Sequence, residues 1–364
     1  MTETAYDVVV VGGGPAGLTA ALYTTRLGLD TALVDRGGGR AAMMQDTHNV
    51  IGVTEDVSGG EFLQTAKAQV ESYGADVHRD FIESASRVDE ADGDGSGGSE
   101  PRFRLEGGDG AYLARRVVLA TGFSDARPDP PLPATGRGLH YCLHCDAYMF
   151  VDEPVYVMGT GDSAAYVAMI MLNFTDEVDL LTRGDDPQWS DETDEMLANH
   201  PVDVISEDIT AVERDDDGWL EAFEFEDGAV RAYRGGFPMY GSNYNTDLHE
   251  ELGCDINDDG TVAVGDHGET SVDGVYAVGD VTPGHNQIPV AMGQGAKAGI
   301  QIHMDLRPFP RSLDDIGDLG PVGKGDVPAV SPALLATAVA HEGHAAGPRV
   351  EGGEADAGQQ AVDD

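Results

Sequence analysis

The stretch DVVVVGGGPAGL at residues 7–18 decides the fold of this chain. Its valines form a β-branched run typical of a buried strand, and Gly12, Gly14 and Gly17 follow in the spacing GxGxxG. A helical stretch at 18–27 and a short strand at 31–34 lead to Asp35, and 35 − 12 places that acid 23 positions after Gly12. This order predicts a doubly wound α/β unit that binds a dinucleotide. Its glycines let the backbone approach a pyrophosphate at the helix N-terminus, and the acid can accept both ribose hydroxyls.

A second copy of this pattern begins with a strand expected over 154–158. The turn GTGDSA follows at 159–164, and then come a helical stretch to 173 and a strand over 177–181. Thr182 stands 23 positions after Gly159 (182 − 159), where the first copy has Asp35. We therefore predict a second nucleotide-binding domain. The alternative is a doubly wound domain that has lost its ligand, because the third glycine and the ribose acid are both missing.

Two further strands are expected to end near the same ligand. VVLATG at 117–122 is a buried strand that ends in a tight turn, and GVYAVGDV at 274–281 is a strand that delivers Asp280 at its carboxyl end. Ligands of open α/β sheets bind at the carboxyl ends of the strands. Asp280 is therefore a candidate to contact a cofactor.

The composition excludes several classes of protein. The length of 364 residues suggests two or three domains, and 21 Lys plus Arg against 66 Asp plus Glu give a formal charge of −45. So few cations argue against binding to nucleic acid or to anionic membranes. The chain is nevertheless 41% hydrophobic, which excludes a disordered polyanion. Acids spread over the whole length are typical of proteins from a salt-saturated cytoplasm, so we expect a halophilic source.

The remaining segments carry no targeting signal that we recognise. The first residues lead straight into the folded motif, and no apolar stretch reaches the ~20 residues of a spanning helix, so we expect a soluble, cytoplasmic protein. The stretch EADGDGSGGSEP at 90–101 is typical of a solvated hairpin loop. Residues 311–364 are rich in Gly, Pro, Ala and acids, which predicts a mostly disordered tail with a short helix around 332–340.

The three cysteines indicate redox chemistry. Cys142 and Cys145 form a CxxC motif, whose spacing permits a reversible disulfide. The alternative is half of a zinc site, which would need two more soft ligands, and Cys254 is the one further cysteine. We expect Cys254 to be an ordinary, partly buried thiol. An imidazolium at His144 would stabilise a thiolate and make the pair more oxidising; alternatively, His144 is a solvent-facing spacer without influence.

At these motifs the chain resembles the low-molecular-weight thioredoxin reductase family, flavoproteins whose FAD domain is interrupted by a pyridine-nucleotide domain. The resemblance covers about residues 6–307, in family order, and includes CLHCD at 142–146 and GSNYNTDL at 241–248. It implies an FAD-binding domain at 1–122 and 242–308, an NAD(P)-binding-like domain carrying the CxxC at 123–241, and an acidic tail at 309–364. It also implies a homodimer whose partner is a thioredoxin-like protein or a small disulfide.

The resemblance assigns roles to individual residues. Cys145 is the thiol nearest the flavin, Cys142 exchanges with the partner disulfide, and Asp146 donates and accepts the proton. The residues implied at FAD are Gly12, Gly14, Pro15, Ala16, Gly17, Asp35, Arg40, Asn49, Ala120, Thr121, Gly122, Gly279, Asp280, Gln287 and Ile288. The residues implied at the pyridine nucleotide are Gly159, Gly161, Asp162, Ser163, Ala164 and Arg183.

Departures from the family pattern leave the electron donor open. Members that use NADPH carry an arginine cluster after the second strand of the nucleotide domain, whereas here Arg183 is followed by Gly184, Asp185 and Asp186. NADPH, NADH, a deazaflavin and ferredoxin are therefore all candidate donors. Arg40 and the stretch DTHNVIG at 46–52 also resemble gliotoxin-type thiol oxidases, which form disulfides and pass electrons to oxygen. A flavin-binding redox sensor without catalysis is the non-enzymatic alternative.

Overall fold

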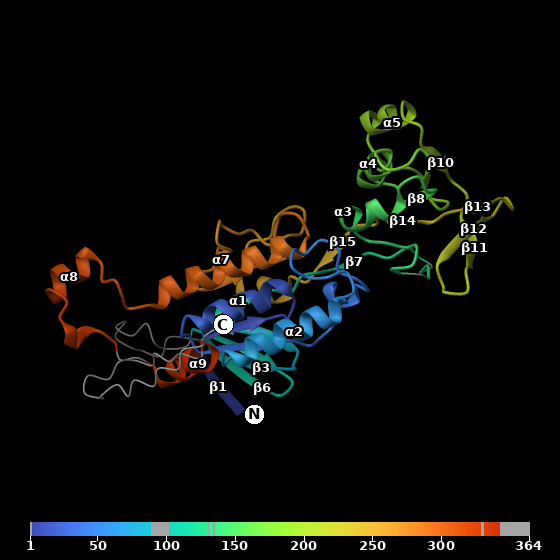
Figure 1. The fold of residues 1–364 in the computed structure, drawn as a ribbon. Coiled ribbons are helices and arrows are strands. Elements are labelled where there is room, and N and C mark those ends of the chain that lie inside the picture. The colour runs from blue at the N-terminus through green and yellow to red at the C-terminus, as the bar shows by residue number, and fades with distance from the viewer. Residues whose placement is uncertain (1, 89–101, 130, 134, 329–330, 343–364) are drawn as a thin grey trace, which may run out of the picture.

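The computed structural model describes residues 2–88, 102–129, 131–133, 135–328 and 331–342. The chain forms two lobes joined by a narrow connection (Figure 1). The first lobe contains the N-terminus and the long helix α7 (Ile288–Leu306), and the second contains the middle of the chain. The predicted fold class, two doubly wound units with the second inserted into the first, is confirmed.

The first lobe is built on a seven-stranded sheet. Its parallel strands are β1 (Thr2–Val11), β2 (Thr31–Val34), β3 (Asp76–His78), β6 (Gly110–Leu119) and β16 (Val275–Ala277). The strands β4 (Ile82–Arg87) and β5 (Phe103–Gly107) extend it in antiparallel fashion. Because β1, β2, β6 and β16 run parallel, the predicted ligand-binding turns that follow them meet at one edge.

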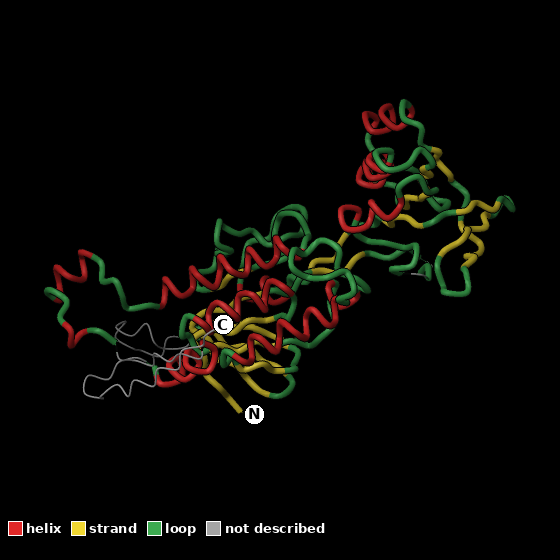
Figure 2. Tube along the Cα trace, in the orientation of Figure 1, coloured by secondary structure: helices red, strands yellow, loops and turns green. Residues whose placement is uncertain are grey.

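Both faces of this sheet are covered, which explains the uninterrupted valine run of β1. Val8 and Val10 pack with α1 (Pro15–Arg26) and α7 on one face, while Val9 and Val11 pack with α6 (Asp247–Leu252) on the other. In Figure 2 the helices α1, α2 (Gly59–Ser72) and α7 lie along the same side of the strands. Gly295 allows α1 and α7 to approach closely because it has no Cβ. A Cβ at this position would lie 2.1 Å from the carbonyl oxygen of Ala16.

The second lobe contains a smaller parallel sheet in the order β10-β9-β8-β14. Its strands are β8 (Val155–Met158), β9 (Val178–Leu181), β10 (Asp203–Ile205) and β14 (Gly235–Pro238), and its helices are α4 (Asp162–Met171) and α5 (Asp191–Ala198). A three-stranded antiparallel sheet of β11 (Ile209–Arg214), β12 (Leu220–Phe225) and β13 (Val230–Ala232) adjoins it. The strands β7 (Phe123–Asp125) and β15 (Ser242–Tyr244) pair where the chain passes between the lobes.

The part of the C-terminal tail that the structure describes contains more helix than we predicted. The helices α8 (Leu313–Leu319) and α9 (Pro332–Glu342) are joined through the short 3₁₀ helix η3 (Lys324–Asp326). The ring of His341 stacks on Tyr73 at 3.8 Å between centroids, so α9 lies against the end of α2. Residues 343–364 and the predicted hairpin loop at 90–101 lie outside the described residues.

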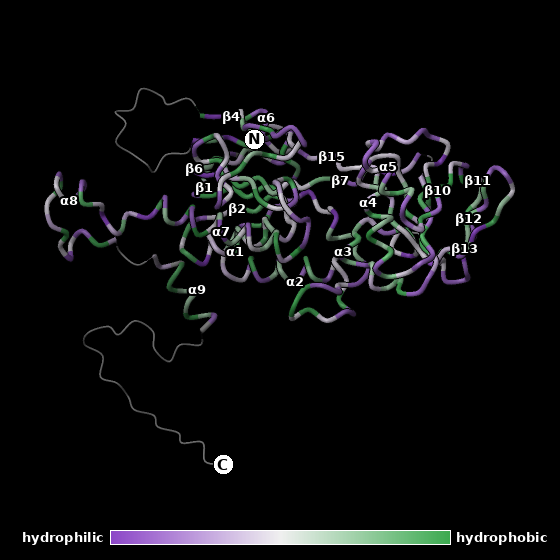
Figure 3. Tube along the Cα trace, turned by 90° about the horizontal axis from the view of Figure 1, so that it is seen from above, coloured by the Kyte–Doolittle hydropathy of each residue, from purple (hydrophilic) through white to green (hydrophobic). Residues whose placement is uncertain are grey.

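Hydrophobic residues are concentrated inside the two lobes, whereas hydrophilic residues dominate the connecting loops (Figure 3). Among the helices that the structure describes, none has both the length and the apolar character needed to cross a membrane.

A buried histidine makes the stability of the first lobe depend on pH. His249 of α6 is 0% exposed, and burial lowers its pKa from 6.5 to about 4. Between these two pKa values the unfolded chain binds one proton more, so the free energy of unfolding falls as the pH falls through this window, by up to about 3 kcal/mol. In urea unfolding at constant salt, we expect the loss between pH 7 and 4.5 to be about 2 kcal/mol larger for the wild type than for His249→Leu. Equal losses would contradict this assignment.

Candidate active site

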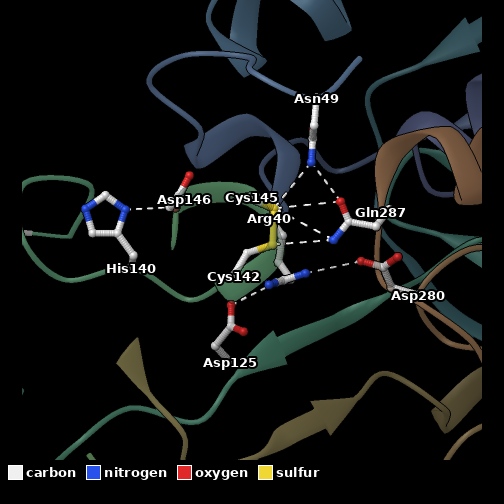
Figure 4. Close-up of a disulfide and its surroundings, with 9 residues drawn as sticks. All are labelled: Arg40, Asn49, Asp125, His140, Cys142, Cys145, Asp146, Asp280 and Gln287. Carbon is white, nitrogen blue, oxygen red and sulfur yellow. Dashed lines mark hydrogen bonds and ion pairs between the residues drawn. A yellow bond between two sulfur atoms is a disulfide. The ribbon is translucent and has the colours of Figure 1, made fainter. Parts of the chain in front are cut away.

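The redox pair lies at the junction of the two lobes. Cys142 precedes the short helix α3 (Leu143–Asp146), and its sulfur is bonded to that of Cys145. Figure 4 shows side chains of the first lobe, Arg40, Asn49, Asp280 and Gln287, facing this disulfide. The CxxC of the second lobe therefore meets the carboxyl edge of the first-lobe sheet.

Two amide side chains contact the sulfur atoms. Gln287, the residue before α7, places its Nε2 3.4 Å from Cys142 Sγ and 3.8 Å from Cys145 Sγ. Asn49 donates from Nδ2 to Gln287 Oε1 at 2.7 Å and to Cys145 Sγ at 3.6 Å. Both residues were predicted to lie near the flavin, and the structure places them at the disulfide.

An arginine flanked by two carboxylates lies beside the pair. Arg40 Nε is 2.9 Å from Asp125 Oδ2, and its Nη1 is 3.3 Å from Asp280 Oδ2. Its guanidinium also lies 4.3 Å from the ring centroid of Phe123. Burial raises the pKa of Asp280, and the positive charge of Arg40 opposes that rise. The sequence singled out Arg40 and Asp280, but it did not indicate Asp125.

Asp146 has a buried partner that the sequence did not indicate. His140 Nδ1 lies 2.8 Å from Asp146 Oδ2, and the backbone N–H of Gly138 donates to His140 Nε2 at 3.3 Å. Since Nε2 accepts a hydrogen bond, we assign the ring proton to Nδ1, from which it is donated to the carboxylate. The ring is 6% exposed and packs edge-on against Phe150 at 5.2 Å. The sequence feature that could have indicated His140 is its position two residues before Cys142.

His144, between the two cysteines, is exposed. Within the part of the chain that the structure describes, His144 makes no side-chain hydrogen bond or ion pair. The N–H groups at the sulfurs come instead from Asn49 and Gln287.

The first glycine turn has the shape that a bound dinucleotide requires. A Cβ at Gly17 would lie 1.9 Å from the carbonyl oxygen of Gly12, whereas nothing lies within 4 Å of a Cβ built at Gly14. The space beside Gly14 is thus open at the N-terminus of α1, whose first turn carries no acid. The Asp35 carboxylate lies beside this turn and accepts from Gly13 N at 3.0 Å. These residues fit the pyrophosphate and ribose of FAD.

The other residues predicted at FAD gather at the same edge. Pro15 and Ala16 open α1, and a Cβ at Gly279 would lie 2.8 Å from the Cβ of Ala16. The segment Ala120, Thr121 and Gly122 follows β6, and Ile288 is the first residue of α7.

The second glycine turn does not fit the 2′-phosphate of NADPH. Arg183 Nε pairs with Asp208 Oδ1 at 2.9 Å, and its side chain is 4% exposed. Asp185 and Asp186, which follow it, are exposed acids. Asp162 stands in the first turn of α4, where its carboxylate accepts from Ser190 N at 3.0 Å. These acids would oppose an anionic ligand at this end of the lobe.

The predicted nucleotide residues nevertheless form the expected local structure. Gly159, Gly161, Ser163 and Ala164 lie between β8 and the first turn of α4, as in the first copy. Thr182 is 2% exposed, so the residue at the ribose position lies in the interior. This lobe lies apart from the FAD residues and shares with them the disulfide at the junction.

An open, shallow hollow lies on the surface of the loop that contains Asn49. Residues 48–56 line it, and they include Asn49, which contacts Cys145. The ring of His48 packs edge-on against Tyr148, with 5.7 Å between centroids. The cysteines themselves do not line this hollow.

The third cysteine lies in a different environment. Cys254 is 7% exposed, and burial raises the pKa of its thiol. Within the ranges that the structure describes, no group of three or more His, Cys, Asp or Glu side chains is arranged to hold a metal ion.

The chain is similar over most of its length to known proteins. The model of the family described as pyridine nucleotide-disulphide oxidoreductase matches residues 6–295. The thioredoxin reductase of Bacillus subtilis (strain 168) is 30% identical over 328 residues, which cover 85% of this chain and 98% of that protein. The thioredoxin reductase structure from Streptococcus pyogenes MGAS5005 is 28% identical, with a TM-score of 0.74, covering 84% of this chain and 99% of that one. The structure of HlmI is 29% identical, also with a TM-score of 0.74, covering 83% and 92%.

Proposed function

Because the chain belongs to the pyridine nucleotide-disulphide oxidoreductase family, we propose that Cys142 and Cys145 exchange electrons with a thioredoxin-like protein or a small disulfide. The protein is an FAD-dependent disulfide oxidoreductase of the thioredoxin reductase type. The observation that carries the proposal is the disulfide of one lobe lying against the carboxyl edge of the other, where FAD fits.

The glycine turn and the strand ends are the proposed binding site of the cofactor. Gly12, Gly14 and Gly17 would hold the pyrophosphate, Asp35 the adenosine ribose, and Asp280 the ribityl chain. When bound, FAD supplies two-electron chemistry at the disulfide. Arg40 supports this arrangement because its ion pair with Asp280 keeps that half-buried carboxylate oriented.

The two cysteines would divide the exchange between them. The Cys142 thiolate attacks the disulfide of the partner, so a mixed disulfide forms while the partner's S–S bond breaks and releases a thiolate. The Cys145 thiolate then attacks Cys142, which restores the internal disulfide and releases the second partner thiolate. Each released thiolate takes up one proton. In the opposite direction the same steps oxidise a dithiol.

Asp146 is the proposed group that moves these protons. It directly follows Cys145, and its backbone N–H donates to the carbonyl oxygen of Cys142 at 3.2 Å. His140 supports this role because its Nδ1–H keeps a hydrogen bond on one carboxylate oxygen and so orients the group. His140 is therefore a positioning residue.

The second lobe determines which electron donor the enzyme can use. Thioredoxin reductases use FAD and NADPH. In this chain the buried Arg183 and the exposed Asp185 and Asp186 leave no cation for the 2′-phosphate at that turn, within the part of the chain that the structure describes. We therefore expect no preference of the enzyme for NADPH over NADH.

Anaerobic titration of the purified flavoprotein tests both the donor and the direction. We add NADPH and, in a parallel sample, NADH, and follow the flavin absorbance. The reductase proposal expects bleaching, with NADH at least as effective as NADPH. Bleaching by NADPH alone would contradict the assignment of Arg183, Asp185 and Asp186.

A thiol oxidase is the second candidate function, and the observation that favours it is the poor fit of NADPH at the second glycine turn. No bleaching by either nucleotide, together with peroxide formation from dithiols in air, would assign this direction and overturn the reductase proposal. The parallel measurement uses a small dithiol, which serves as the electron donor in this direction.

The cellular setting is also a proposal. A reversible disulfide and the single buried thiol of Cys254 fit a reducing compartment, so we propose a cytoplasmic enzyme. We propose a homodimer, as the resemblance to thioredoxin reductases implies.

A further inference from the structure

We propose that Asn49 and Gln287 form an amide clamp that stabilises the thiolate of the reduced Cys142–Cys145 pair, and that both are catalytic residues of the dithiol step. Their proposed place near the flavin does not imply this role. The inference rests on the proposed dithiol chemistry and adds the groups that control the acidity of the thiols.

The clamp joins two segments that are far apart in sequence. Asn49 belongs to the loop that follows the short 3₁₀ helix η1 (Ala41–Met43), and Gln287 precedes α7. Asn49 Nδ2 donates to Gln287 Oε1 at 2.7 Å, which links the two side chains. In this arrangement Gln287 Nε2 faces the sulfurs, as Figure 4 shows.

The donors of the clamp have few other partners. Among the described residues, the acceptors of Gln287 Nε2 are the two sulfur atoms, at 3.4 and 3.8 Å. A sulfur in a disulfide is a weak acceptor, whereas a thiolate is a strong one. The amide donors therefore gain more from the reduced anion than from the disulfide, which is the condition for favouring that state.

The clamp also distinguishes the two sulfurs. When the disulfide takes up two electrons and one proton, the S–S bond breaks into one thiol and one thiolate. Gln287 Nε2 lies closest to Cys142 Sγ, while Oε1 lies 3.8 Å from Cys145 Sγ and can accept the S–H of that thiol. Asn49 Nδ2 lies 3.6 Å from Cys145 Sγ, so the clamp has donors for both sulfurs, but its shortest N–H···S contact is with Cys142, the residue proposed to attack the partner.

Other charged or titratable groups near the pair have partners of their own. Arg40 is paired with Asp125 and Asp280, and Asp146 is bonded to His140. The other titratable groups of this region include Tyr141, which precedes Cys142 and whose pKa is raised by burial, and His48, which packs against Tyr148. His144, Tyr148 and His285 are exposed. Within the described residues, the hydrogen-bond donors to the sulfurs are thus the amide N–H groups.

The test is the pH dependence of alkylation of the reduced holoenzyme. The protein is reduced with excess dithiol without oxygen and freed of reductant, and iodoacetamide is added at a series of pH values. Mass spectrometry then follows the peptide that contains Cys142 and Cys145. The variants are Gln287→Met, which keeps the length but removes the N–H donors, and Gln287→Glu, which keeps the shape and adds a negative charge. Gln301→Met, in the helix α7 that follows Gln287, is the control.

We expect Gln287→Met to raise the thiolate pKa by about one unit, so that alkylation at pH 7 is about tenfold slower. Gln287→Glu should be slower still, and Gln301→Met should match the wild type. Asn49→Leu should give an intermediate rate, because Gln287 then loses its orientation. Flavin content and far-UV circular dichroism identify any variant that fails to fold.

Identical alkylation profiles for the wild type, Gln287→Met and Gln287→Glu would overturn the clamp. That outcome differs from failure of the proposed function. If the wild-type pair could not be reduced and reoxidised at all, the dithiol chemistry itself would be wrong.

Discussion

Replacing Cys142 by serine is expected to reduce disulfide exchange at least about a thousandfold while flavin remains bound. Serine cannot form the mixed disulfide, and the remaining Cys145 has no internal partner. Cys254 cannot substitute, since it is buried in the core of the first lobe with α6 and β16. Turnover of a small disulfide with the donor found by titration, or of a small dithiol with oxygen, measures the loss.

The matched control for this prediction is Cys254→Ser, which removes a thiol but leaves the CxxC intact. Its activity should stay near that of the wild type. Cys145→Ser should be as inactive as Cys142→Ser because either change removes the disulfide. If Cys142→Ser kept a tenth of the wild-type rate in both assays, the assignment of the redox pair would fail.

Substituting Gly17 by alanine is expected to reduce the flavin content of the purified protein about tenfold or more. The new Cβ would lie 1.9 Å from the carbonyl oxygen of Gly12 and 3.2 Å from the Cβ of Ala120. The turn must then open, and α1 can no longer present its N-terminus to the pyrophosphate. The ratio of flavin to protein absorbance measures occupancy, and added FAD tests whether binding recovers.

Gly60→Ala is the control for this substitution. Gly60 is exposed in α2, and a Cβ there would meet only Ser58 Oγ, at 3.9 Å. It should retain full flavin content. If Gly17→Ala also retained it, the first glycine turn would not be the cofactor site. Circular dichroism separates loss of flavin from loss of fold.

The sequence could predict the parts of this molecule that are locally encoded. The valine run, the glycine spacing and Asp35 belong to one continuous segment, so their pattern predicts the strand, turn and helix directly. Asp280 could be predicted for a similar reason, since it lies at the end of a recognisable strand. The CxxC spacing likewise predicts its own disulfide, which the structure contains.

The contacts at the sulfurs depend on tertiary structure, and the sequence alone did not show them. Asn49 and Gln287 are 238 positions apart, and no local pattern indicates that their amides bond to each other. His140 is close to the CxxC in sequence, but its burial between the rings of Phe150 and Phe237 depends on β14. The sequence left two possibilities for His144, a thiolate-stabilising imidazolium or a solvent-facing spacer, and in the structure this side chain is exposed.

For NADPH binding by the second lobe, too, the sequence could predict one part of the evidence and not the other. Asp185 and Asp186 could be predicted to weaken NADPH binding from their place after Arg183. The pairing of Arg183 with Asp208, in the loop before β11, could not be predicted. These two residues are 25 positions apart and meet only in the folded structure. Both findings lead to the same expectation for the electron donor.

The central claim is that Cys142 and Cys145 form a redox pair that exchanges electrons with the cofactor of the first lobe. Anaerobic reductive titration with dithionite, followed by flavin absorbance and by a count of free thiols, tests it most directly. The wild type should take up four electrons before excess reductant appears, two for FAD and two for the disulfide. The double variant Cys142→Ser/Cys145→Ser should take up two. Uptake of two electrons by both proteins, with the wild-type disulfide still intact, would contradict the account.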